Sequence, residues 1–170
     1  MDKHVRRIKA ATANYPRFPD GRIDYTNEKV CFVLNCVVMF KNEILLTLRG
    51  ENVIVYRNTF SGVSGFIDAM NLSIREQAIL ELQEEVSMPS VLIRSLQISE
   101  PFVQYDKEIG REWHVLAVLV ESSKKFSPVT NWENKSVEWH QLSEIDHLDL
   151  SPGFPETLQI ALRLRSSANN

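Results

Sequence analysis

Three glutamates, Glu81, Glu84 and Glu85, lie close together in the sequence at a spacing that could support chemistry. On an α-helix, positions i, i+3 and i+4 share one side, so the three carboxylates would face one spot. Like charges at this spacing repel one another unless a cation lies nearby. Ligands that are all oxygen favour a hard divalent ion, Mg²⁺ or Mn²⁺, over zinc. The pattern indicates a candidate metal site, and a solvated glutamate-rich helix face is the alternative.

A predicted helix that begins near Ile74 positions these glutamates. Ser73 is a suitable N-cap, and Glu76 follows it by three residues, which is the spacing of a capping box. Met88-Pro89 ends the helix, because proline cannot continue it and disfavours helical geometry in the residue before it. The apolar residues of the helix fall on one side, next to the glutamates: Ile74, Ala78, Ile79, Leu82 and Val86.

A glycine loop precedes this helix, and the combination resembles the Nudix hydrolase family. The box of that family reads glycine, five residues, Glu, seven residues, Arg-Glu, an aliphatic, any residue, Glu-Glu, any residue, glycine, aliphatic. Residues 81–88, ELQEEVSM, follow the second half of the box, and residues 64–68, SGFID, look like its glycine loop. The resemblance covers residues 30–164. It implies the fold class α/β, as a Nudix-like α/β/α sandwich with a mixed β-sheet.

The box departs from the family pattern mainly at positions that hold the loop and helix together. Leu80 stands in place of the box arginine, and Ser87 stands in place of the closing glycine. Gly65 lies one residue further from the helix glutamates than the family spacing. The first box glutamate falls on Asn71 or on Leu72, depending on the direction of counting. Because the metal-binding positions of the box match, these departures affect the expected activity more than the expected fold.

The resemblance implies a metal-dependent hydrolase that cleaves the pyrophosphate bond of a nucleoside diphosphate linked to another moiety. Glu81, Glu84 and Glu85 would hold Mg²⁺ or Mn²⁺, with the backbone carbonyl of Gly65 as a further ligand. The metal would neutralise the diphosphate and lower the pKa of a bound water.

Further side chains are candidates for proton transfer and substrate binding. Glu84 by analogy with the family, or a loop carboxylate such as Glu108 or Glu112, would accept the proton of the attacking water. Arg49 and Arg57 stand on either side of an expected hairpin over residues 51–56 and could bind a substrate phosphate. Solvated turn and surface residues are the alternative for each of these loop acids and arginines.

Composition restricts the class of protein and its partners. The 170 residues suffice for one ordinary domain, and 44% hydrophobic and 24% charged residues are typical of globular proteins. A formal net charge of −3 gives no reason to expect a nucleic acid polymer as partner. A small phosphate-containing molecule is the expected partner, and a homodimer is one open oligomeric state. Because we find neither a membrane-spanning run nor a signal-peptide core, we expect no membrane partner and a cytoplasmic location.

The chain divides into an N-terminal extension, residues 1–28, and a Nudix-like domain, residues 29–170. We expect the extension to be polar and irregular, and either packed on the domain or partly flexible. Residues 30–40, VCFVLNCVVMF, predict a central strand covered on both faces. Cys31 and Cys36 point to opposite faces of that strand and cannot form a disulfide, so both are expected to be core thiols. Further strands are expected over residues 43–48, 59–67, 90–104 with a break at Pro101, 113–121 and 136–142, followed by short and then closing helices.

Two other functional classes fit the sequence. A catalytically impaired binding or regulatory module would keep the fold, and the altered box positions support it. An isomerase of the isopentenyl diphosphate type shares the fold, but it would need a cysteine in a polar active-site loop, where we find none. The sequence contains no Walker-type phosphate loop and no dinucleotide fingerprint, and its histidines lack the paired spacing of zinc ligands.

Overall fold

The computed structural model describes residues 2–53 and 55–168 of the chain. Its helices are α1 (Lys3–Ala11), α2 (Ile74–Val86) and α3 (Phe154–Ala168), with the 3-10 helices η1 (Ser90–Leu92) and η2 (Leu142–His147). Its strands are β1 (Val30–Phe40), β2 (Glu43–Arg49), β3 (Phe60–Ser61), β4 (Val63–Phe66), β5 (Ile93–Ile98), β6 (Phe102–Asp106), β7 (Arg111–Ser122) and β8 (Asn134–Gln141).

Strand β1 lies at the centre of a mixed sheet, as its apolar sequence predicts. It pairs in parallel with β7 over residues 30–39, and antiparallel with β4 and β2 on its other side. The path through the sheet is β3-β2-β1-β7-β5, while β6 adds to β7 and β8 adds to β2. Cys31 and Cys36 are free, buried thiols, in agreement with the sequence prediction.

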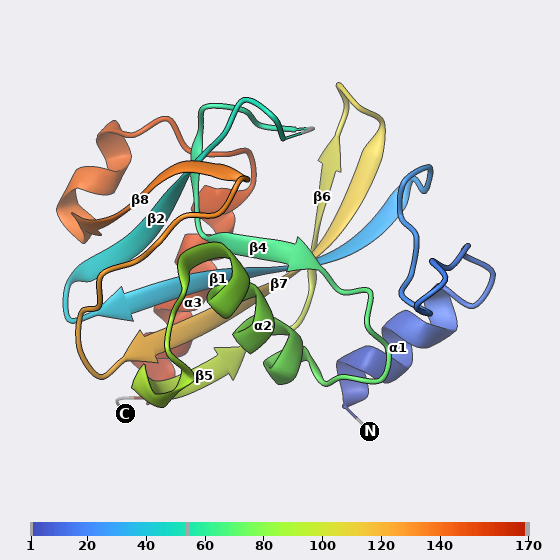
Figure 1. The fold of residues 1–170 in the computed structure, drawn as a ribbon, viewed down its shortest axis with the longest axis horizontal. Coiled ribbons are helices and arrows are strands. Elements are labelled where there is room, and N and C mark those ends of the chain that lie inside the picture. Colours follow the sequence, from blue (N-terminus) through green and yellow to red (C-terminus); the bar gives the residue numbers. More distant parts are fainter. Residues whose placement is uncertain (1, 54, 169–170) are drawn as a thin grey trace.

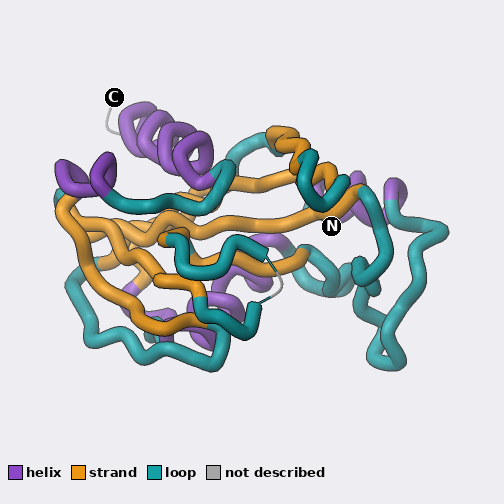
Figure 2. The backbone as a smooth tube through the Cα atoms, turned by 90° about the horizontal axis from the view of Figure 1, so that it is seen from above, coloured by secondary structure: helices purple, strands orange, loops and turns teal. Residues whose placement is uncertain are grey.

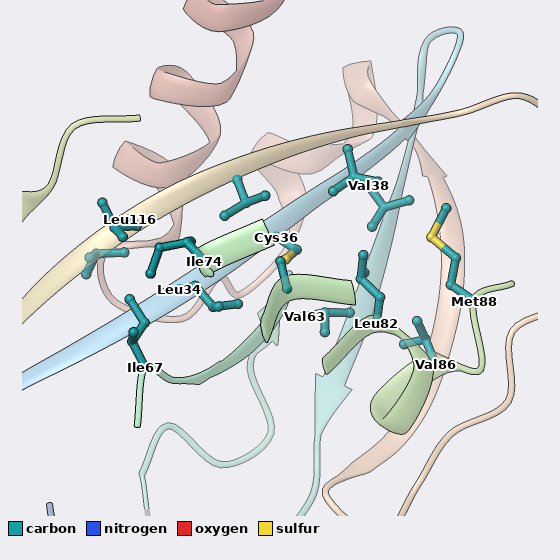
Figure 3. Packing of buried hydrophobic residues seen from close by; sticks show 14 of the residues in the cluster. Leu34, Cys36, Val38, Val63, Ile67, Ile74, Leu82, Val86, Met88 and Leu116 are labelled. Carbon is teal, nitrogen blue, oxygen red and sulfur yellow. The ribbon is translucent and has the colours of Figure 1, made fainter. Parts of the chain in front are cut away.

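Helices cover both faces of this sheet, which confirms the α/β/α sandwich (Figures 1 and 2). On one face α2 contributes Ile74, Leu82 and Val86 to a cluster that includes Leu34 and Cys36 of β1 (Figure 3). On the other face, α3 contributes Phe154, Leu158 and Ala161 to a second cluster. Strand β1 contributes Val37 and Met39 to the same cluster. A strand that is apolar on both faces can therefore separate the two layers.

The N-terminal segment is more ordered than the sequence suggested. Residues 3–11 form helix α1, where we expected an irregular chain, and the buried Val5 and Ile8 join the same core cluster as α2. Asp2 accepts hydrogen bonds from the backbone N–H of His4, at the start of α1, and from that of Ile74, at the start of α2 (2.8 and 3.2 Å). One side chain thus caps both helices.

The prediction of a hairpin over residues 51–56 is wrong. The described residues of that stretch form bends without a strand, and Tyr56 and the nearby Asn58, in the turn that follows, adopt positive φ angles of 56° and 60°. Such left-handed residues terminate extended structure, which explains why no paired strands form. No helix among residues 2–53 and 55–168 has the length and apolar content needed to cross a membrane.

Candidate active site

A cavity of about 360 Å³ opens where the glycine loop, helix α2 and the sheet meet. Part of its lining comes from β1, β4, β6 and β7, whose register aligns Val33 with Phe66 and Val115, and Gln104 with Trp113. The acidic and basic side chains that line the cavity are Arg22, Arg49, Asp68, Glu81, Glu84 and Glu133. Two of the three predicted metal-binding glutamates therefore reach one cavity.

The start of α2 fixes the direction of the glutamates. Ser73 accepts a hydrogen bond from the backbone of Glu76, and the Glu76 carboxylate accepts one from the backbone of Ser73, so the predicted capping box is present. One side of the helix is buried through Ile74, Ala78 and Leu82. Because this side is fixed against the sheet, the next arc of the helix turns towards β4 and the cavity.

Gly65 on β4 allows Glu81 to approach the backbone. A Cβ atom at this position would overlap the Glu81 carboxylate, so any other residue would force that side chain to move from where it lies. This contact brings the carboxylate of α2 next to the glycine loop, as the family resemblance implies. The arrangement leaves Glu81 half-buried and Glu84 exposed at the mouth of the cavity.

Glu85 lies deeper than the other two glutamates and has fixed partners. Only 3% of its surface is exposed. Its carboxylate accepts hydrogen bonds from the backbone N–H of Ser64 (3.2 Å) and from the side-chain amide of Asn134 (3.0 Å). It thereby ties α2 to β4 and to the start of β8, so its position depends on three separate elements.

Gln77 joins helix α2 to the loop that precedes it. In this part of the chain, the sequence departs from the family box. Its side chain is 4% exposed. The amide oxygen accepts from the backbone N–H of Ala69, and the amide nitrogen donates to the carbonyl of Leu72, both at 3.3 Å. Leu80, at the position of the box arginine, is 44% exposed. The neutral side chain of Gln77, and not a residue at position 80, therefore anchors this loop.

Helix α2 ends in a left-handed residue even though the box glycine is absent. Ser87 adopts φ 54° and ψ 36°. The N–H of Ser87 donates to Gln83, and that of Met88 donates to Leu82, which satisfies the last carbonyls of the helix. The chain thus keeps the turn that glycine would favour and adopts it with a serine.

Glu81, in the cavity lining, and the adjacent buried Glu85 both have raised pKa values. Burial, followed by repulsion from Glu85 and Glu84, raises the pKa of Glu81 to about 8. Burial also raises the pKa of Glu85 to about 7, although its hydrogen bond from Asn134 acts in the opposite direction. Raised pKa values in a cleft are typical of functional sites, because structure alone rarely favours gathering acids there.

Glu133 is a fourth carboxylate of the cavity that the sequence analysis missed. It directly precedes β8, it is half-buried, and burial raises its pKa while Arg49 lowers it. Its carbonyl oxygen accepts from the N–H of Gly50 at 2.7 Å, which fixes this stretch beside the end of β2. The signal in the sequence was weak, since a single acid at the edge of a strand has no distinctive spacing.

The structure separates the other predicted site residues. Arg49 lines the cavity, is mostly buried and donates from Nε to the carbonyl of Val55 (3.2 Å), whereas Arg57 is not among the lining residues. Glu108 and Glu112 are also absent from the lining. Glu112 instead lies 2.6 Å from Nε2 of His114, one strand position away from the cavity-facing Trp113. Arg49 therefore lies with Glu81, Glu84 and Glu133 in the cavity lining, whereas Arg57, Glu108 and Glu112 do not.

The oxygen donors here suit a divalent ion that keeps part of its water shell. Among the residues that the structure describes, no three acidic, histidine or cysteine side chains converge to hold one ion. Mg²⁺ is commonly bound by only one or two carboxylates together with waters and substrate phosphates, so full convergence is not required. Glu81, Glu84 and the backbone of Gly65 border the same cavity and fit such a site.

The fold is the Nudix fold, as solved structures show. A Nudix hydrolase from M. smegmatis is 19% identical and has a TM-score of 0.57, with 82% of this chain and 84% of that chain covered. The Nudix domain of NrtR from Shewanella oneidensis, complexed with ADP ribose, is 14% identical with a TM-score of 0.66, covering 94% and 98%.

A third similar structure is a larger protein, the bifunctional NMN adenylyltransferase/ADP ribose pyrophosphatase from Francisella tularensis, complexed with AMP and a Mn ion. It is 15% identical with a TM-score of 0.64, and while 94% of this chain is covered, the chain spans only 45% of that protein. Neither a protein-family model nor a curated protein matches the sequence.

Proposed function

We propose that the protein is a Mg²⁺- or Mn²⁺-dependent pyrophosphohydrolase that cleaves a nucleoside diphosphate linked to another moiety. The observation that carries the proposal is the group of carboxylates, Glu81, Glu84 and Glu133, bordering one cavity beside Gly65. Similar structures hold ADP ribose, or AMP with a Mn ion, which supports a nucleotide with a diphosphate as the substrate class.

The side chains of the cavity suggest a division of roles. Glu81, Glu84 and the carbonyl of Gly65 would hold the ion, which when bound neutralises phosphate charge and lowers the pKa of water. Glu85 would fix the end of α2 through Ser64 and Asn134 rather than contact the substrate. Glu84, which is exposed at the cavity, would accept the proton of the attacking water.

Positive charge at the cavity would meet the phosphate groups. Arg49 lies in the lining and interacts electrostatically with Glu85 and Glu133. Because it already donates to Val55, its guanidinium is held in one place. A fixed guanidinium beside the carboxylates can bind a non-bridging phosphate oxygen without ordering a flexible side chain first.

The experiment is an assay of metal-dependent hydrolysis across nucleoside diphosphate sugars, ADP ribose, dinucleotides and nucleoside triphosphates, with Mg²⁺ and with Mn²⁺. The readout is chromatographic detection of the nucleoside monophosphate that cleavage of the pyrophosphate bond releases. We expect turnover of at least one diphosphate-linked nucleotide and none after chelation. If no compound is hydrolysed with either metal, while a nucleotide still binds, the impaired binding or regulatory module becomes the better account. The isomerase gains no support, because Cys31 and Cys36 are buried and neither lines the cavity.

A further inference from the structure

The N-terminal segment contributes a guanidinium to the cavity of the proposed active site. Arg22 lines the cavity together with Asp68, Glu81 and Glu84, although it lies more than forty residues before any of them. It belongs to a tight turn in which Phe18 donates to the carbonyl of Arg22 at 2.9 Å, and Gly21 occupies the left-handed region at φ 88°. The sequence had placed this turn in the extension, outside the domain.

Buried neighbours fix this turn against the glycine loop. Ile23 is 1% exposed, and its N–H donates to the carbonyl of Asp68 at 3.1 Å. Tyr25 is 3% exposed, stacks on Phe66 with ring centroids 5.2 Å apart, and donates its hydroxyl to the carbonyl of Ile67 at 2.9 Å. Because Ile23 and Tyr25 are both anchored to the glycine loop, the position of the Arg22 Cα atom relative to the cavity is fixed.

Two carboxylates orient the guanidinium and leave one edge of it open. Nε of Arg22 donates to Asp20 at 2.8 Å, and Nη1 lies 3.4 Å from Asp68. Nη2 has no hydrogen-bond partner among the residues that the structure describes. A guanidinium has five N–H donors in a planar fork, so one edge remains for a ligand with anionic oxygens. The side chain is 53% exposed, which keeps that edge accessible.

We propose that Arg22 binds a phosphate oxygen of the substrate, so that the N-terminal turn supplies one residue of the active site. This inference rests on the proposed function, since it deepens the account of the same cavity. Arg22 and Arg49 would then contact the diphosphate from two separate elements, the N-terminal turn and the end of β2. The ligand chemistry is that of a diphosphate, whatever group it carries.

Calorimetric titration with inorganic pyrophosphate in the presence of Mn²⁺ tests the inference without requiring turnover. Losing a charge-assisted hydrogen bond to phosphate typically weakens binding by about 10- to 100-fold, so Arg22→Gln should raise the dissociation constant by that factor. Arg22→Lys should recover part of the loss, because the charge returns without the fork. The melting temperature should stay near that of the wild type, since the ion pair with Asp20 is exposed.

Two matched variants separate phosphate binding from a role in the turn. Arg17→Gln changes an arginine of the same turn that donates to Thr12 and does not line the cavity, so pyrophosphate binding should be unchanged. Asp20→Asn breaks the Arg22 ion pair and keeps its guanidinium, so its effect should be far smaller than that of Arg22→Gln. Equal losses in Arg22→Gln and in either control would overturn the inference, as would wild-type affinity in Arg22→Gln or no pyrophosphate binding by the wild type.

Turnover in the substrate panel distinguishes this inference from the proposed function. If the wild type hydrolyses a substrate and Arg22→Gln leaves both KM and pyrophosphate binding unaltered, only the role of Arg22 is wrong. If nothing is hydrolysed and pyrophosphate binding still depends on Arg22, the hydrolase proposal fails and the binding role of this residue stands.

Discussion

The two ends of helix α2 are held and used in different ways. At its beginning, Ser73, Glu76 and Gln77 anchor the helix to the preceding loop through short-range hydrogen bonds, where the family box would use other residues. At its end, Glu81 and Glu84 border the cavity at the positions that the family box requires. Several side chains can supply an anchoring hydrogen bond, whereas binding a hard cation requires carboxylate or other oxygen ligands. If the proposed function holds, the first end can therefore diverge, while the second must keep its carboxylates.

The largest expected effect is at the second end of the helix. Glu84→Gln keeps size and removes the charge and the base, so kcat should fall by the roughly 10²- to 10⁴-fold typical of a lost general base. Unfolding by urea should be nearly unchanged, because Glu84 is exposed. Glu138→Gln on the exposed side of β8 is the control. A larger loss in Glu108→Gln or Glu112→Gln than in Glu84→Gln would place the base in the β6–β7 hairpin, either in its loop (Glu108) or at the start of β7 (Glu112).

A second variant tests the first end of the helix. Gln77→Leu preserves bulk but leaves the N–H of Ala69 and the carbonyl of Leu72 without their buried partner. The free energy of unfolding should fall by about 1–3 kcal/mol, measured by urea denaturation. Gln83→Leu, at an exposed position on the same helix, is the matched control. Equal stability of the two variants would mean that Gln77 does not anchor the loop.

The pH dependence of the metal-free protein tests the second end of the helix, which carries the buried carboxylates. The pKa values of Glu81, about 8, and Glu85, about 7, lie above the ordinary 4.5. The folded state therefore binds more protons than the unfolded state over this range. Their contribution to stability is fully present below about pH 4.5 and is lost as pH rises through about 7 to 8.

Melting temperatures with chelator, with Mg²⁺ and with Mn²⁺ measure this linkage. A bound cation competes with protons for the carboxylates, so millimolar metal should raise the melting temperature more near pH 8 than near pH 5. Glu81→Gln should flatten the pH dependence and reduce the metal effect. An equal metal effect at both pH values, or none, would indicate a solvated acidic helix face.

The smallest expected effect concerns the turn after the helix. Ser87 has φ 54°, where a side chain costs energy that glycine avoids. Ser87→Gly should raise the free energy of unfolding by roughly 0.5–1 kcal/mol without changing turnover. Ser87→Ala should give no such gain, since it keeps a Cβ. A loss of stability in Ser87→Gly would show that the serine side chain contributes more than its backbone geometry costs.

Local patterns in the sequence predicted α2, its capping box and the central strand β1, because each depends on neighbours within a few residues. Helix α1 was missed, since its apolar contribution is limited to Val5 and Ile8 in an otherwise polar segment. Glu133 and Arg22 were missed because they reach the cavity only through long-range packing. Arg49 and Arg57 looked equivalent in sequence, yet a shift in register between Leu48 and Arg49 and the irregular loop that follows give them different surroundings.

The double cap formed by Asp2 also affects how the chain can be handled and how it folds. Its carboxylate joins the N–H of His4 to that of Ile74, which lies 72 residues after Asp2 in the sequence. Helix α1 therefore cannot complete its docking during synthesis until α2 has left the ribosome, and such distant contacts slow folding. A purification tag fused directly ahead of Asp2 would crowd the start of the glutamate-bearing helix, so it should be cleaved before activity is measured.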